Sequence, residues 1–290
     1  WWEHLVEIGH QYGYFPNASK IWMVVKKEKF EEAQAVFDGT GVNVTQEGKR
    51  YLGASLGTKA FTENFVSEKV LEWTKEIEVL STFAVSQPHA AYACYTHGLS
   101  SKWTFLCRTI PNISERLRPL EEAIRYKFLP AITGQSALSD VERELLALPS
   151  RLGGLGIINP VTSSDIQHLT SINISTPLMS LILQQSTTYP ISCQESQRDC
   201  KRRAIKHKRE LEQNRALDLV NKLPTSYQKA LPFISEKGAS CWLTALPLQK
   251  MVMLCTKGPS EMPFVSDMAG LHHFYHLTVF VDTISLLNMP

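Results

Sequence analysis

A dense run of positive charge between residues 198 and 209 is the first feature of this sequence that could do chemistry. A helix this rich in cations presents a surface that suits the phosphate backbone of a nucleic acid. The same composition also describes a solvated helix face, whose charge Glu210 and Glu212 begin to offset, and both interpretations stay open. Against one acid, Asp199, the run holds Arg198, Lys201, Arg202, Arg203, Lys206, Lys208 and Arg209.

A serine motif at residues 53–57 matches the G-x-S-x-G pattern of hydrolases. In those enzymes the serine stands at a tight turn between a strand and a helix, and an acid and a histidine complete the site. Here Ser55 falls within or just beyond a predicted strand, and no later pair of acid and histidine stands out. A hydrolase is therefore disfavoured.

Clustered glycines at residues 153–156 could let backbone amides approach a phosphate closely. A nucleotide-binding P-loop also needs Lys and then Ser or Thr after its last glycine. Ile157 and Ile158 stand at those positions. The sequence favours a tight turn between helices over a phosphate cradle.

No convincing metal site is visible. Cys193, Cys200 and His207 follow one another at seven-residue steps, whereas zinc sites prefer ligand pairs two to four apart and need four ligands. The histidines near the C-terminus, His272, His273 and His276, have no partner pair. The six cysteines are widely spread without a Cys-x-x-Cys pair, which favours reduced thiols over a disulfide framework.

Composition predicts an ordinary folded chain. With 290 residues, 43% of them hydrophobic and 20% charged, the chain can bury roughly three quarters of its unfolded surface. The net charge of +2 means that any nucleic-acid contact must be local. We find no secretory signal and no apolar run of the length that crosses a bilayer. We therefore expect an intracellular protein, in the nucleus or cytoplasm, and interpret the opening Trp1-Trp2 as the start of a fragment cut from a longer frame.

Hydrophobic periodicity predicts an α+β fold. Up to residue 57 we expect mixed structure, with helices at 1–12 and 26–37, a strand at 21–25, and a hairpin of 42–45 with 50–56 that turns at Glu47-Gly48. Beyond it we expect helices at 66–80, 90–107, 113–128, 163–172 and 195–222. Pro130 should stop the third of these helices, and Ser139 with Glu142 forms a capping box.

An ordered set of motifs resembles the reverse transcriptases of non-LTR (LINE-like) retrotransposons. A helix leads to Asn17-Ala18-Ser19-Lys20 and a strand, then comes Tyr51-Leu52-Gly53, and later Leu148-Pro149-Ser150-Arg151-Leu152-Gly153-Gly154-Leu155-Gly156. In that family the Asn-x-x-Lys motif ends the palm, the Tyr-Leu-Gly lies in the primer-grip hairpin, and the Leu-Pro…Gly-Gly-Leu-Gly stretch follows the thumb. The resemblance runs to about Lys257.

The resemblance implies a role for each part. Residues 1–57 would be a palm-end remnant with the primer-grip hairpin, 58–190 a helical thumb and connection, and 191–257 a basic helical region. Lys20 would be the palm lysine, a compact charge with a transferable proton, and Tyr51, Leu52 and Gly53 would position the primer end. Nucleic-acid contacts would come from Lys102, Arg108, Arg151, Lys201, Arg202, Arg203, Lys206, Lys208 and Arg209. Further thumb cations would be Lys59, Lys69 and Lys75.

One departure from the family decides the chemistry. Polymerases hold two metal ions with carboxylates, and this chain contains no Asp-Asp pair. We expect no cofactor in this chain, although the parent enzyme would need Mg²⁺, and no polymerisation by the chain alone. Its partners would be an RNA or DNA template–primer and the missing N-terminal catalytic part of the same polyprotein. The alternative is a non-enzymatic helical protein that binds nucleic acid or a partner through its basic region.

The last part of the chain departs from the family pattern after Lys257-Gly258. Plausible codons for residue 259 onward, re-read one base earlier, give a continuation similar to a Cys/His segment of the family. We therefore interpret residues 258–290 as a frameshifted or disordered tail without a selected fold.

Overall fold

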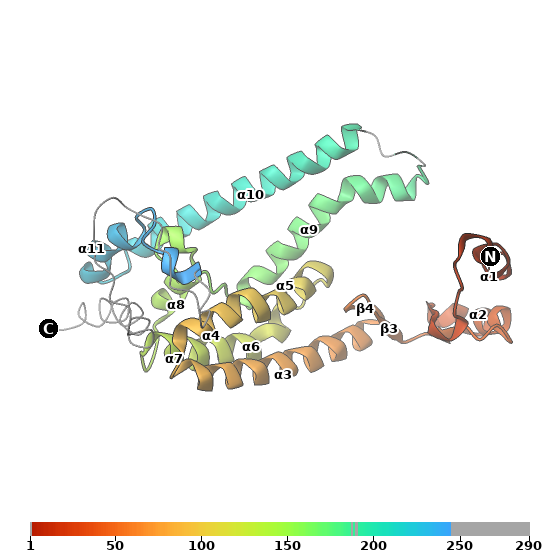
Figure 1. The fold of residues 1–290 in the computed structure, drawn as a ribbon, viewed down its shortest axis with the longest axis horizontal. Coiled ribbons are helices and arrows are strands. Elements are labelled where there is room, and N and C mark those ends of the chain that lie inside the picture. Colours follow the sequence, from red (N-terminus) through yellow and green to blue (C-terminus); the bar gives the residue numbers. More distant parts are fainter. Residues whose placement is uncertain (1, 187, 189–190, 245–290) are drawn as a thin grey trace. The chain divides into compact units, whose positions relative to one another are not determined.

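The computed structural model describes residues 2–186, 188 and 191–244, and the chain divides into two compact units, Trp1–Lys69 and Val70–Pro290. Helices dominate and the strands are few and short (Figure 1), in keeping with the α+β class. The tail predicted at 258–290, the end of the basic region after residue 244, and the three C-terminal histidines lie outside the described residues.

The first unit contains a small strand–helix–strand crossover. After α1 (Trp2–Gly9) and a 3-10 turn (His10–Tyr12), β1 (Trp22–Val24) leads through α2 (Phe30–Phe37) to β2 (Asn43–Thr45). The two strands are parallel, with Trp22 opposite Asn43 and Val24 opposite Thr45. A parallel pair needs such a crossover, because its strands run in the same direction.

The predicted strand pairing is wrong at this point. The segment 42–45 pairs with β1, not with the residues that follow it. The hairpin is formed by β3 (Gly48–Tyr51) and β4 (Ala54–Gly57), with Tyr51 opposite Ala54. Its turn therefore lies at Leu52-Gly53 instead of Glu47-Gly48, because these two residues supply the left-handed backbone that a two-residue hairpin turn requires.

Residues 2–58 form these elements without a core of their own. The only buried residue among them is Gly9, which has no side chain. Parallel strands normally have both faces covered, yet Trp22 is 41% exposed on β1. This segment has the secondary structure of a larger sheet but not the burial that stabilises one.

The second unit is helical (Figure 1). The long α3 (Lys59–Ala84) crosses the boundary between the units and is followed by a chain of shorter helices. In order these are α4 (Pro88–Cys94), a π turn (Tyr95–Leu99), α5 (Ser100–Thr109), a 3-10 turn (Ser114–Leu117), α6 (Arg118–Ala123), a second π turn (Ile124–Phe128), α7 (Leu129–Thr133), α8 (Asp140–Ala147), a 3-10 turn (Ser150–Leu152), α9 (Pro160–Leu183), α10 (Ile191–Val220), α11 (Thr225–Ile234) and a 3-10 turn (Cys241–Thr244).

Both π turns contribute buried aromatic side chains to the core of this unit. Tyr95 from the first turn stacks on Phe128 from the second, with ring centroids 4.9 Å apart and planes 16° from parallel. Ile77, Leu117 and Leu120 are completely buried in the same unit. Stacked aromatic rings add to the free energy of burial, so the two π turns are fixed by packing.

Two helices continue through prolines beyond their predicted ends. Pro130 does not stop the third helix but lies in the first turn of α7. The π turn just before it widens the helix, where the proline ring would otherwise collide with the carbonyl of Tyr126. The helix predicted at 163–172 extends over the whole of α9 and continues through Pro177; Figure 1 shows it bending in its second half.

The predicted capping box is confirmed. The Ser139 hydroxyl accepts a hydrogen bond from the Glu142 amide at 3.2 Å, and the Glu142 carboxylate accepts one from the Ser139 amide at 2.8 Å. Among the described helices, none is long and apolar enough to cross a membrane.

Candidate nucleic-acid interface

The hairpin apex exposes two apolar side chains of the first unit. Tyr51 is 65% exposed and Leu52 is 80% exposed. Leu52 has a φ of 47° and Gly53 a φ of 86°, so both central residues of the turn are left-handed. Glycine adopts this conformation freely, but in leucine it is unfavourable because the Cβ crowds the backbone. The fold thus holds an apolar side chain in solvent at a strained position.

Lys20 ends a short 3-10 turn, Ala18–Lys20, just before β1. The Asn17 side chain caps this turn by accepting hydrogen bonds from the Ser19 amide at 3.1 Å and the Ser19 hydroxyl at 2.7 Å. On the other side, the side-chain amide nitrogen of Asn43 donates to the carbonyls of Ser19 and Ile21, at 2.9 and 3.1 Å. The backbone on both sides of Lys20 is therefore fixed, while its side chain is exposed.

A cation–π contact joins the hairpin to β1. The ammonium of Lys49 on β3 lies 3.7 Å from the centre of the Trp22 ring. Such contacts stabilise by about 0.5–1 kcal/mol at exposed sites. This contact and the Asn43 clamp hold the hairpin and the Lys20 turn within one unit, and the sequence did not predict either of them.

The serine motif does not form a hydrolase elbow. Ser55 lies within β4, directly opposite Arg50 of β3. Its hydroxyl lies 3.2 Å from the hydroxyl of Thr62. A serine in the middle of a strand lacks the sharp turn that exposes a nucleophile.

The glycine segment after α8 is a structural turn, as predicted. Its amides donate to carbonyls at the end of α8 and in the loop itself: Gly154 to Pro149, Leu155 to Leu146 and Gly156 to Leu148. Donors that are already paired in this way cannot cradle a phosphate. A Cβ on Gly154 would lie 2.0 Å from the Leu148 carbonyl oxygen, so this glycine is required for close packing.

The cations of α10 are exposed along the first two thirds of the helix. Several form ion pairs along or beside the helix: Arg202 with Asp199 at 3.0 Å, Lys208 with Glu212 at 3.7 Å, and Lys206 with Glu210 at 3.9 Å. Exposed pairs of this kind contribute about 0–1 kcal/mol and exchange readily. Within the described part of the chain, Arg198, Lys201 and Arg209 form no ion pair.

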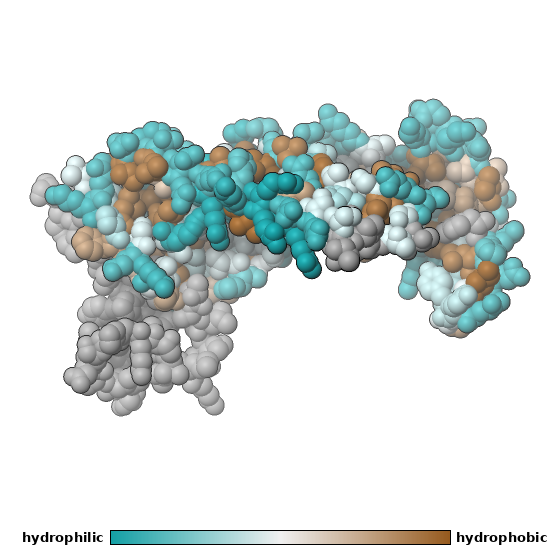
Figure 2. Space-filling view, turned by 90° about the horizontal axis from the view of Figure 1, so that it is seen from above, coloured by the Kyte–Doolittle hydropathy of each residue, from teal (hydrophilic) through white to brown (hydrophobic). Residues whose placement is uncertain are grey.

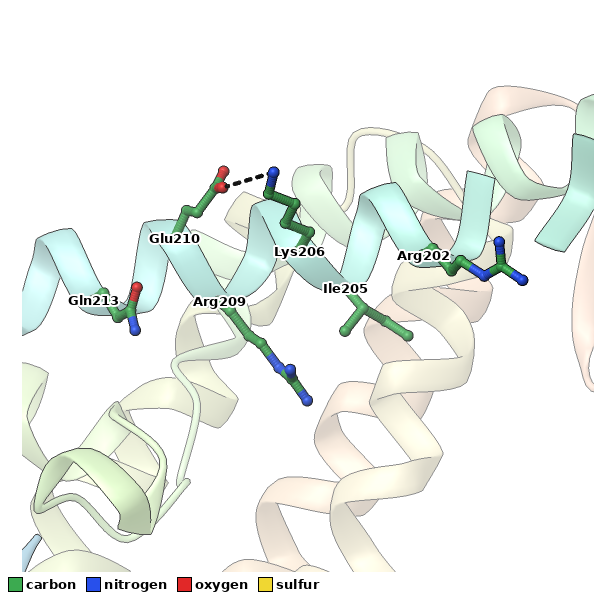
Figure 3. A pocket seen from close by; sticks show the side chains of 6 residues that line it. All are labelled: Arg202, Ile205, Lys206, Arg209, Glu210 and Gln213. Carbon is green, nitrogen blue, oxygen red and sulfur yellow. Dashed lines mark ion pairs between the residues drawn. The ribbon is translucent and has the colours of Figure 1, made fainter. Parts of the chain in front are cut away.

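One face of α10 combines cations with a shallow hollow. Arg198, Arg202, Lys206 and Arg209 recur at steps of four and three, which places them on one side of the helix. A hollow of about 390 Å³ on this side is lined by Arg202, Ile205, Lys206, Arg209, Glu210 and Gln213. Figure 3 shows Ile205, Arg209 and Gln213 pointing to one side of the helix, with the Lys206–Glu210 pair above them. In Figure 2 a strip of strongly hydrophilic side chains runs along the part of the surface that α10 occupies.

The other predicted contact residues differ in availability. Both carboxylate oxygens of Glu76 accept hydrogen bonds from Lys102, at 2.6 and 2.7 Å. Arg151 pairs with Glu212 of α10, which also faces Lys208. Arg108 is exposed near the end of α5. Lys102 and Arg151 therefore use their charges to hold two elements together, whereas Arg108 and the α10 cations without an ion pair among the described residues are open to a ligand.

Among the described residues, no three side chains of His, Cys, Asp or Glu come together as a metal ion would require. Cys200 contacts the Arg203 guanidinium at 3.3 Å and belongs to no such group.

Comparison with protein-family models, curated proteins and solved structures gives no match to this chain.

Proposed function

We propose that this chain is the palm end, thumb and connection of a reverse transcriptase of the non-LTR type, and that it holds template–primer nucleic acid for a catalytic part carried elsewhere in the same polyprotein. The chain has no Asp-Asp pair, so in this proposal it does not polymerise alone. It contributes a grip on the primer end and contacts to the phosphate backbone.

The hairpin apex is the observation that carries this proposal. It is apolar, exposed and held in a strained left-handed turn at Leu52. Strain of this kind persists at sites where a fixed geometry is used. An apex that presents Tyr51 and Leu52, directly before the long α3, suits a grip on the last nucleotides of a primer.

The open face of α10 supports the proposed contacts to the phosphate backbone. Each cation that neutralises a phosphate releases a counterion, so binding through this face should weaken steeply with salt. The four cations of the face recur about every 6 Å along the helix, a spacing that can follow a nucleic-acid backbone.

The missing core of residues 2–58 supports the proposed catalytic partner. A parallel strand pair without a single buried side chain is stabilised only when further polypeptide covers it. The palm part that the resemblance places before this segment would supply that cover.

The test is binding of a fluorescent RNA–DNA hybrid with a recessed primer end, measured by anisotropy over a series of salt concentrations. We expect Arg202→Gln with Arg209→Gln to weaken binding and to lower the salt slope by about 0.9 for each phosphate that is no longer neutralised. Arg118→Gln is the matched control, because Arg118 is an exposed arginine on α6 that pairs with Glu115.

The apex is tested in the same assay. Tyr51→Ala should reduce the preference for a recessed end over a blunt duplex without changing the salt slope. Equal binding of recessed and blunt duplexes by the parent chain would contradict the primer grip. Absence of binding at low salt would contradict the whole proposal.

A second candidate function rests on α10 alone. Arg198, Lys201 and Arg209, which have no ion pair among the described residues, would also serve a non-enzymatic helical protein that binds any nucleic acid. That function predicts the salt dependence but no preference for a primer end and no effect of Tyr51→Ala.

A further inference from the structure

α9 carries a row of exposed apolar side chains that no other described element covers. Leu169 is 60% exposed, Ile172 42%, Met179 51% and Leu183 81%. With Thr176 between them they recur at steps of three, four, three and four. This spacing lines one face of a helix and matches the seam by which two helices interdigitate. We call these five residues the α9 seam.

The residues that flank the α9 seam in the sequence are uncharged. From Ile166 to Gln194 the sequence contains no Asp, Glu, Lys or Arg. An uncharged apolar seam gives a partner helix affinity but no preference for one charge sign. Any such preference must come from the neighbouring helix.

That neighbour is the basic helix α10, which returns alongside α9 (Figure 1) and contacts it. Its residues 198–209 hold seven cations and one acid. A helix seated on the α9 seam would therefore lie in a positive field, where acidic flanks attract and basic flanks repel.

We propose that the α9 seam binds an amphipathic helix of a partner protein, with an apolar seam flanked by Asp and Glu. A second copy of this chain suits the seam less well, because it would bring two basic α10 helices together. The proposal does not depend on the primer grip, since it uses the seam of α9 and not the hairpin apex; the cations of α10 serve both proposals.

The experiment uses two fluorescent helical peptides of three heptads each, with the same leucine seam and either Glu or Lys at the flanking positions. The full chain should bind the Glu peptide at least tenfold more tightly at low salt, and added salt should shrink that ratio. Leu169→Asp with Met179→Asp should lower the affinity for the Glu peptide about tenfold or more. Val79→Asp, at an exposed apolar position of α3, is the matched control and should leave it unchanged.

If the α9 seam binds a second copy of the chain or a membrane surface, the measurements give different results. A dimer in sedimentation that Leu169→Asp dissociates would assign the seam to a second copy and overturn the proposal. Equal affinity for the Glu and Lys peptides, or binding only to anionic vesicles, would overturn it as well. If the aspartate variants lose helicity, Leu169→Gln with Met179→Gln repeats the test with a smaller perturbation.

Discussion

The guanidinium of Arg143 donates two hydrogen bonds of 2.7 Å to the carboxylate of Glu121, and the two side chains are only 4% and 11% exposed. A third bond of 2.8 Å runs from Arg143 to the carbonyl of Ile157. One arginine thus joins α8, α6 and the segment after the glycine turn. Two parallel bonds to one carboxylate are the strongest form of ion pair that arginine makes.

Arg143→Met should therefore destabilise the second unit strongly. The substitution leaves the Glu121 carboxylate buried without its partner, which typically costs about 3–5 kcal/mol. Urea unfolding followed by circular dichroism would measure it, and Arg143→Met with Glu121→Leu should recover part of the loss. Arg118→Met, in an exposed pair, should leave the unfolding midpoint unchanged. If Arg143→Met costs no more than this control, the buried pair does not stabilise the unit.

Adding a glycine to the hairpin apex and removing one should change the stability of the turn in opposite directions. Leu52→Gly removes a side chain from a left-handed position and should stabilise the turn by roughly 1 kcal/mol. Gly53→Ala puts a Cβ at a φ of 86° and should destabilise it by a similar amount. Hydrogen exchange of the amides in β3 and β4 would report both changes. If Leu52→Gly accelerates exchange, Leu52 stabilises the turn through contacts and is not strained.

The glycine turn offers a comparison within one segment. A Cβ on Gly154 would lie 2.0 Å from the carbonyl oxygen of Leu148 and 2.5 Å from that of Leu145. Backbone cannot yield at such distances, so Gly154→Ala should unfold this turn or the end of α8. Gly156 has a φ of 70° and open space around its Cβ position, so Gly156→Ala should cost only about 1 kcal/mol of backbone strain. Thermal unfolding of both variants would check the order, and equal costs would contradict it.

Local sequence signals predicted individual helices and caps better than they predicted which strands pair. The capping box at Ser139 and the helix around residues 195–222 depend on neighbours in the sequence, and α8 and α10 show both. The segment 42–45 alternates in a way that suits either a hairpin or a parallel pair, because the choice depends on which strand lies beside it. Pro130 was predicted as a helix end because the sequence gives no sign of the π turn that accommodates it.

The sequence indicated the candidate residues but not the contacts that hold them in position. The resemblance indicates Tyr51 and Leu52, the charge density indicates the α10 cations, and the structure exposes these side chains. The clamp of Asn43 on the Lys20 turn and the Lys49–Trp22 contact join residues more than twenty positions apart. One signal could have indicated the Asn43 clamp. Asn43 stands at the start of a predicted strand, where its side-chain amide can reach a neighbouring backbone.

Alkaline pH should destabilise the second unit through Cys107. Burial raises the pKa of this thiol above its ordinary value of 9.0, so the folded chain keeps a proton that the unfolded chain releases. Stability is complete below about pH 9 and falls as the pH rises toward the folded pKa, by at most about 1.4 kcal/mol per pH unit for one proton. Burial also raises the pKa of the Tyr92 and Tyr95 hydroxyls above 10.0, so a further loss should begin about one pH unit higher.

Urea unfolding at several pH values from 7 to 11 would separate these groups. Cys107→Ala removes the first titration, so its stability should stay level until the tyrosines begin to titrate, although a small cavity lowers it at every pH. Tyr95→Phe should keep the loss that starts at pH 9 and reduce the later one. Cys94→Ala, at an exposed cysteine, should give the same profile as the parent chain. A parent profile that is flat up to pH 10 would mean that the Cys107 thiol ionises as easily in the folded chain as in the unfolded one, and that its burial does not oppose its charge.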